Sequence, residues 1–139
     1  YNRKAIELEA GPQEPADLRF VIDHIAKPPI ASGEIDAWSA LMEPFRELPH
    51  VSCKLSGMIT EADWLRWTPN DLRPYVETVL EIFGVDRVMF GSDWPVSLLA
   101  GQYVTVKQAL EQALPPLTRS ERDSVFGGNA IAFYGLDVS

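Results

Sequence analysis

The sequence has one cysteine, few basic residues and no long apolar run, and each shortage excludes something. Cys53 cannot form an internal disulfide, so the chain is expected to work where thiols stay reduced, in the cytoplasm. Lys and Arg number 12 against 20 Asp and Glu, which gives a formal net charge of −8. A surface with that charge repels polyanions, so nucleic acid is not an expected partner.

Signals for membranes and for several common kinds of site are also missing. No window reaches the roughly 18 apolar residues of a membrane-spanning helix. Residues 1–7 contain no apolar stretch of the secretory kind. The sequence has no Walker-type glycine loop, no CxxC pair and no HExxH motif. It therefore indicates neither a membrane partner nor any of these three sites.

What is present is the composition of one globular domain. Hydrophobic residues make up 46% and charged residues 23% of the 139 residues, enough apolar side chain for a single core. The segment 9–17 is polar, holds Gly11 and two prolines, and is expected to be a loop.

Three runs of β-forming residues end in polar side chains and alternate with helical patterns. The runs span 18–24, 51–56 and 87–93 and predict strands. Helical spacing or capping signals predict helices over 35–45, 68–83, 103–114, from 118 onward and over 129–134.

Capping signals set the expected helix limits. Ser32 is expected to cap the first helix, and Pro44 to kink or stop it. Thr68 and the pair at 118–121 have the spacing of capping boxes. Gly84 is placed to end the second helix in a left-handed turn.

The alternation of strands and helices predicts an α/β fold with a parallel sheet and right-handed crossovers. Three strands leave two unpaired edges, which proteins avoid. The pattern matches the last three units of an eight-stranded (β/α)8 barrel, a fold of about 250 residues. The whole of 1–139 is therefore expected to form a single incomplete barrel domain.

The active site of such a fold lies at the carboxyl ends of the strands. The ends at 23–24, 56–57 and 92–94 are expected to converge on one mouth. Asp93 could deprotonate water or bind a metal, or it could simply form a turn at the strand end. His24 could ligate a metal, polarise a carbonyl or relay a proton, or be a hydrogen-bonded structural histidine. His50 precedes a strand, at the opposite face, and is given no role.

Alternation along the second strand separates its two faces. Val51, Cys53 and Leu55 should pack against helices, which makes Cys53 a core residue. Lys54 then points into the barrel, where it needs a carboxylate partner. An interior ion pair is favoured over a Schiff-base lysine of the aldolase kind.

Other residues near the expected mouth could meet a substrate. Trp64, Trp67 and Trp94 could stack on a sugar ring or simply pack a lid. Lys27 could meet an anionic or hydroxylated substrate or remain solvated.

Four ordered motifs resemble a known family. They are FVIDHIAKP at 20–28, CKLSGM at 53–58, FGSDWP at 90–95, and GNA at 128–130 with FYG at 133–135. Over about 18–136 the chain resembles the amidohydrolase-related family, in the branch of L-fuconolactonase and L-rhamnonolactonase hydrolases. The match at 1–17 is loose.

The resemblance implies a distorted (β/α)8 barrel in which the three strands are the sixth to eighth. It implies hydrolysis of a small-molecule sugar lactone, with Asp93 handling the water proton and His24 polarising the carbonyl. His24 and Asp93 would also be the ligands of a divalent metal such as zinc, which some members use and others lack. Substrate contacts are expected from Lys27, Ser56, Trp64 and Trp94.

One family feature has no counterpart. The sequence contains no H-x-H arrangement of the kind found on the family's first strand, and strands one to five are not represented. The alternative expectation is therefore a catalytically incompetent part of a barrel. Such a chain would act through assembly, as a homo-oligomer that buries its open sheet edges.

Overall fold

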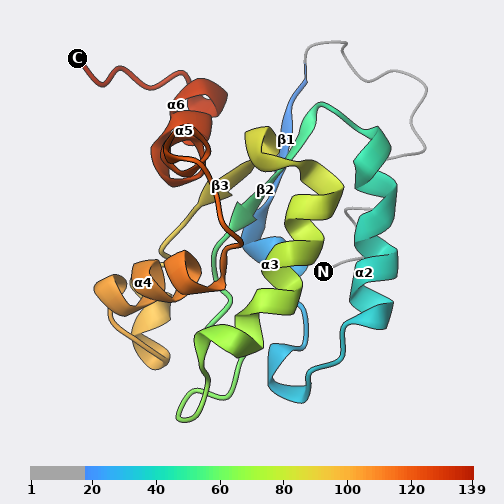
Figure 1. Cartoon of the computed structure of the whole chain (residues 1–139), viewed down its shortest axis with the longest axis vertical. Coiled ribbons are helices and arrows are strands. Elements are labelled where there is room, and N and C mark those ends of the chain that lie inside the picture. The colour runs from blue at the N-terminus through green and yellow to red at the C-terminus, as the bar shows by residue number, and fades with distance from the viewer. Residues whose placement is uncertain (1–17) are drawn as a thin grey trace.

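A parallel sheet of three strands organises the chain. The computed structural model describes residues 18–139 (Figure 1), so the loop expected at 9–17 lies outside the described residues. The strands are β1 (Phe20–Ile22), β2 (Val51–Leu55) and β3 (Val88–Phe90), in the order β1-β2-β3. Phe20 aligns with Val51 and Cys53 with Val88, both in parallel register. The predicted parallel α/β arrangement is confirmed, with strands shorter than expected.

Helices follow each strand. They are α2 (Asp36–Met42), α3 (Pro69–Phe83), α4 (Tyr103–Ala113), α5 (Arg119–Asp123) and α6 (Asn129–Tyr134). A π-helical turn, η7 (Ser124–Gly128), joins α5 to α6. In Figure 1, α2 and α3 lie side by side over one face of the sheet. All five predicted helical regions are present.

The helix ends test the predicted caps. Thr68 and Thr118 each form a capping box, as expected. The helix containing Pro44 gives way to a 3-10 turn, η4 (Glu43–Glu47), because proline cannot donate to the helical ladder.

Two capping predictions are wrong. Ser32 lies in a separate turn, η3 (Ile30–Ser32), and α2 begins after Ile35, since Gly33 with φ 72° turns the chain between them. Gly84 ends α3 with φ 71° but ψ 167°, so it leads into extended backbone rather than a left-handed helical cap.

The core fills the space between the sheet and its helices. Val51, Cys53 and Leu55 alternate with less buried residues along β2 and face this core, as predicted. Burial raises the pKa of the Cys53 thiol, which keeps it protonated and inert. The largest fully buried side chains include Ile25, Met42, Leu55, Leu72, Tyr75 and Leu110.

The guanidinium of Arg87 binds the backbone where α3 ends. Its Nε donates to the carbonyl of Phe83 at 2.9 Å, and its Nη1 donates to those of Leu48 at 2.7 Å and Val51 at 3.1 Å. Burial lowers the pKa of Arg87, but these carbonyls still favour a cation. One side chain therefore joins α3, η4 and the start of β2.

Replacing this side chain should destabilise the fold without touching the strand ends. We expect Arg87→Ala to lower the free energy of unfolding by about 2 kcal/mol, because several carbonyls lose a charged donor. Arg87→Lys should recover little, since one ammonium cannot reproduce the planar fork. Urea denaturation measures both variants, and an unchanged midpoint for Arg87→Ala would contradict this role.

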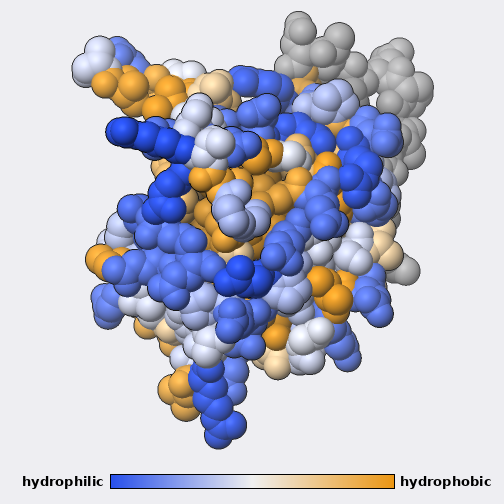
Figure 2. Space-filling view, viewed as in Figure 1, coloured by the Kyte–Doolittle hydropathy of each residue, from blue (hydrophilic) through white to orange (hydrophobic). Residues whose placement is uncertain are grey.

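The helical face of the molecule is largely hydrophilic. Figure 2 shows this face with one apolar area over its middle, between α3 and the α5–α6 region. Among residues 18–139, none of the helices is both long enough and apolar enough to cross a bilayer. A separate group of polar side chains lies at the carboxyl ends of the three strands.

Candidate active site

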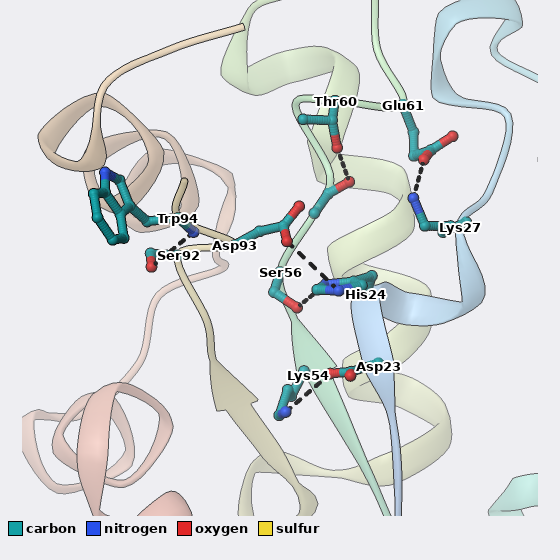
Figure 3. A network of polar contacts seen from close by, with 11 residues as sticks. Asp23, His24, Lys27, Lys54, Ser56, Thr60, Glu61, Ser92, Asp93 and Trp94 are labelled. Atoms are coloured by element: carbon teal, nitrogen blue, oxygen red, sulfur yellow. Dashed lines mark hydrogen bonds and ion pairs between the residues drawn. The ribbon is translucent and has the colours of Figure 1, made fainter. Parts of the chain in front are cut away.

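The three strand ends bring polar side chains together. His24 follows β1, Ser56 follows β2 and Asp93 comes shortly after β3. Figure 3 shows their side chains turned toward one another. The prediction that the three strand ends bring these side chains together is confirmed.

A left-handed turn carries His24 out of β1. His24, Ile25, Ala26 and Lys27 all have φ between 45° and 57°, and the Lys27 amide donates to the His24 carbonyl at 2.8 Å. Left-handed helical backbone costs roughly 1–2 kcal/mol per residue without glycine. A β-branched residue such as Ile25 is a true outlier there. Strain of this kind concentrates at functional sites.

Packing holds this turn in place. The side chain of Ile25 is completely buried in the core. Its carbonyl accepts a 2.8 Å hydrogen bond from the indole Nε1 of Trp38, on α2. The core and a buried hydrogen bond thus stabilise a conformation that the local sequence does not favour.

The imidazole of His24 sits between a hydroxyl and a carboxylate. Its Nδ1 lies 2.8 Å from Ser56 Oγ, and its Nε2 lies 3.6 Å from Asp93 Oδ1. The second distance exceeds that of a hydrogen bond, so the two groups face each other without a direct hydrogen bond. His24 Nε2 and Asp93 Oδ1 are therefore adjacent, and both atoms remain available to hydrogen-bond a third group.

Gly57 makes room for this ring. Its φ is +59°, and a Cβ at this position would lie 2.9 Å from Cβ, Cγ and Nδ1 of His24. Any side chain would displace the imidazole. The sequence predicts Gly57 at a strand end but gives it no role; the signal for one is its place directly after the polar strand end at Ser56.

Asp93 is held by the turn after β3. Its φ of 55° is left-handed, which aspartate tolerates better than most residues. Its carbonyl accepts from the amide of Ser97 at 2.8 Å. Its side chain is only 13% exposed and that of His24 is 28% exposed. The backbone of Asp93 is thus held by the turn, and its carboxylate is mostly buried but not sealed from solvent.

Lys27 forms an ion pair near this site. Its Nζ lies 2.7 Å from Glu61 Oε1 (Figure 3). The hydrogen bond with Glu61 and the charges of Glu61 and Asp93 outweigh partial burial and raise the pKa of Lys27. The lysine stays cationic at neutral pH. Glu61 had no sequence signal, since it lies in an irregular loop.

Lys54 points to the opposite face from Cys53, as predicted, and pairs with Asp23. The Nζ–Oδ1 distance is 2.9 Å, and the ammonium also lies 5.6 Å from the ring centre of Tyr134. Burial opposes the charge, but Asp23 and Tyr134 outweigh it and raise the pKa of Lys54. A Schiff-base lysine needs the reverse, a lowered pKa. The ion-pair interpretation is favoured.

Trapping chemistry checks this conclusion. We expect borohydride with a keto acid to leave Lys54 unmodified, because its amine is protonated and paired. Intact-mass spectrometry and peptide mapping measure the adduct. A reduced adduct on Lys54 would restore the aldolase interpretation.

Two of the three candidate tryptophans are well exposed. Trp64 is 49% and Trp94 64% exposed, and Figure 3 shows the ring of Trp94 turned away from His24. Trp67 is less exposed and donates to the carbonyl of Ala100 at 3.0 Å. Substrate contacts by Trp64 and Trp94 remain predictions, while Trp67 packs between two loops.

His24 and Asp93 are the two candidate metal ligands of this site. His24 and Asp93 offer one nitrogen and one oxygen 3.6 Å apart, and in the described part of the chain no group of three or more His, Cys, Asp or Glu could hold a metal ion. A catalytic zinc keeps three protein ligands. The described residues are therefore insufficient by themselves for a zinc site.

Comparison with known proteins identifies the fold. A family model described as amidohydrolase matches residues 13–136. The chain belongs to the amidohydrolase family. The family match includes all three strand ends described above.

Similar proteins include named lactonases. An L-fucono-1,5-lactonase of Burkholderia ambifaria is 46% identical over 131 residues, with 86% of this chain and 42% of the relative covered. An L-rhamnono-gamma-lactonase of Scheffersomyces stipitis is 27% identical, with 86% and 41% covered. This amidohydrolase chain thus spans less than half the length of the curated relatives it matches.

Solved structures agree. An amidohydrolase of Burkholderia multivorans with bound HEPES superposes with a TM-score of 0.77 at 41% identity, covering 87% of this chain and 46% of that one. A second structure described with bound zinc gives 0.76 at 42% identity, covering 87% and 45%. The fold of this chain is therefore shared with structures about twice its length.

Proposed function

We propose that the protein hydrolyses a sugar-derived lactone, of the L-fucono-1,5-lactone class. The observation that carries the proposal is the adjacency of His24 Nε2 and Asp93 Oδ1 at 3.6 Å. Relatives named as lactonases support the substrate class.

The proposed reaction adds water across the ester. Asp93 takes a proton from water while the water oxygen attacks the lactone carbonyl carbon. A hydrogen bond from His24 stabilises the negative charge that develops on the carbonyl oxygen. The ring C–O bond then breaks, and the proton held by Asp93 passes to the leaving oxygen. The product is the open hydroxy acid, and Asp93 returns to its carboxylate form.

Neighbouring groups favour a hydroxylated substrate. Lys27 is cationic and its side chain is 54% exposed, so it can donate to sugar hydroxyls or the ring oxygen. The exposed indoles of Trp64 and Trp94 offer apolar surface for a sugar face. We propose that these three side chains contact the substrate away from the reacting carbonyl. We also propose that the protein works in a reducing compartment such as the cytoplasm.

The barrel assignment belongs to the same proposal. We propose that β1, β2 and β3 correspond to the sixth, seventh and eighth strands of a distorted (β/α)8 barrel. The parallel order and the active groups at the carboxyl ends of the strands support it.

The assay is direct. The purified chain is incubated with L-fucono-1,5-lactone, and acid release is followed with a pH indicator after subtraction of spontaneous opening. We expect release proportional to protein concentration, and a weaker rate with a lactone of another ring stereochemistry. Rates equal to the blank for every sugar lactone tested would contradict the proposal.

A second proposal concerns assembly through a homo-oligomer. Within residues 18–139, β1 and β3 each have one neighbour in the sheet, which leaves two edges unpaired. Large apolar side chains are also exposed along one segment after β3: Trp94, Val96, Leu98, Leu99, Tyr103 and Val104. Sedimentation velocity tests it, and a compact, cooperatively melting monomer of 15.5 kDa would contradict it.

A further inference from the structure

Ser56 is a buried polar residue at the strand ends. It is 2% exposed, and its Oγ lies 2.8 Å from Nδ1 of His24. Across the part of the chain that the structure describes, this is the hydroxyl's only recorded hydrogen bond. A substrate would reach this oxygen only by displacing the imidazole.

Packing fixes the side chain of Ser56. A Cβ added to Gly91 would lie 2.8 Å from Ser56 Cβ, so the backbone directly after β3 packs against Ser56. On the other side, the imidazole of His24 lies over Gly57. The hydroxyl is therefore held facing Nδ1.

The two neutral tautomers of His24 satisfy these contacts differently. With the proton on Nε2, Ser56 donates to Nδ1 and the Nε2 proton faces the carboxylate of Asp93. With the proton on Nδ1, the ring donates to Ser56 Oγ, and the hydroxyl's own proton is left buried without an acceptor. The Nε2 lone pair would then also face a negative carboxylate. An unmade hydrogen bond in a buried site costs roughly 1–3 kcal/mol, so the first tautomer is favoured.

We propose that Ser56 is a positioning residue that holds neutral His24 with its proton on Nε2. The catalytic meaning of this arrangement rests on the proposed lactone hydrolysis, since a proton on Nε2 is what a donor to the lactone carbonyl needs. The tautomer itself depends only on the contacts among Ser56, His24 and Asp93.

The same contacts exclude Ser56 as an attacking nucleophile. The order hydroxyl, imidazole, carboxylate resembles a hydrolytic triad, but Ser56 Oγ contacts Nδ1 of the ring while Asp93 faces Nε2 (Figure 3). A nucleophile has to reach the carbonyl carbon, and this hydroxyl is buried.

Nitrogen NMR tests the tautomer on the whole 139-residue chain. The sequence has only two histidines, so long-range proton–nitrogen spectra contain two imidazole patterns, and His50→Gln assigns them. We expect the proton on Nε2 and a hydrogen-bonded, unprotonated Nδ1 for His24. In Ser56→Ala the Nδ1 resonance should shift toward that of a free unprotonated nitrogen.

Thr60→Val is the matched control. The Thr60 hydroxyl donates to the carbonyl of Gly57 at 2.9 Å, in the same loop, but does not touch His24. We expect the His24 spectrum to be unchanged in this variant. A wild-type proton on Nδ1, or a spectrum that Ser56→Ala leaves unmoved, would overturn the proposal.

Kinetics give an independent readout. We expect Ser56→Ala to lower kcat about tenfold with little change in KM, and Ser56→Cys to recover part of the loss. A covalent acyl group on Ser56, found by mass spectrometry after a quench, would overturn the positioning role. A chain that shows the expected tautomer but opens no lactone would refute the proposed function and leave this inference standing.

Discussion

Asp93→Asn should lower lactone hydrolysis about a thousandfold. The amide keeps the size and the left-handed turn but cannot take a proton from water, and general base catalysis contributes roughly 10²–10⁴-fold. The backbone carbonyl of Asp93 accepts from the amide of Ser97, and the substitution leaves this bond unchanged, so the fold should persist. Initial rates of acid release, measured with thermal melting on the same samples, give the result.

Asp23→Asn is the matched control for that experiment. Asp23, like Asp93, is a carboxylate beyond the end of a strand, in this case β1. It pairs with Lys54 at 2.9 Å rather than facing His24. We expect its hydrolysis rate to stay within about threefold of wild type. Full activity in Asp93→Asn would show that another group activates the water, and an equal loss in both variants would indicate a general charge effect.

Gly57→Ala should damage both stability and activity. Its φ of +59° strains any other residue, and the new Cβ would lie 2.9 Å from three atoms of His24. Left-handed strain costs roughly 1–2 kcal/mol, and displacing a reacting group by about 1 Å can cost 10²-fold in rate. We therefore expect a loss of about 2 kcal/mol and about a hundredfold drop in hydrolysis.

Gly33→Ala is the control that adds backbone strain without a steric clash against His24. Gly33 has φ +72°, but a Cβ there would meet nothing within 4 Å. This variant should lose a similar amount of stability in urea denaturation while its hydrolysis rate stays near wild type. Equal activity in the two alanine variants would show that the imidazole does not need the space over Gly57.

Much of the fold follows from local patterns. Alternation along 51–55 predicted which face of β2 meets the core, and two capping boxes predicted the starts of α3 and α5. The predicted start of α2 was wrong because Ser32 has the residue type of an N-cap, but the positive φ of Gly33 turns the backbone directly after it. The helix therefore begins only at Asp36. A capping signal is local, but whether the helix begins there depends on the next turn.

The candidate site was predictable only in part. Strand ends of a parallel sheet meet at one edge, so the approach of His24 to Asp93 followed from the pattern. The contact of Ser56 with the imidazole did not, because the ring's direction depends on the left-handed backbone of His24. No glycine in FVIDHIAKP signals that conformation, and tertiary packing imposes it.

The hydrogen bond from Trp38 to the carbonyl of Ile25 connects α2 to the backbone beside the candidate site. That indole is buried, yet it helps hold the residue beside the His24 imidazole in an unfavourable backbone conformation. A mutational screen that scores only turnover would therefore place Trp38 among its hits. Attempts to graft this strand end onto another scaffold would have to bring the α2 tryptophan along.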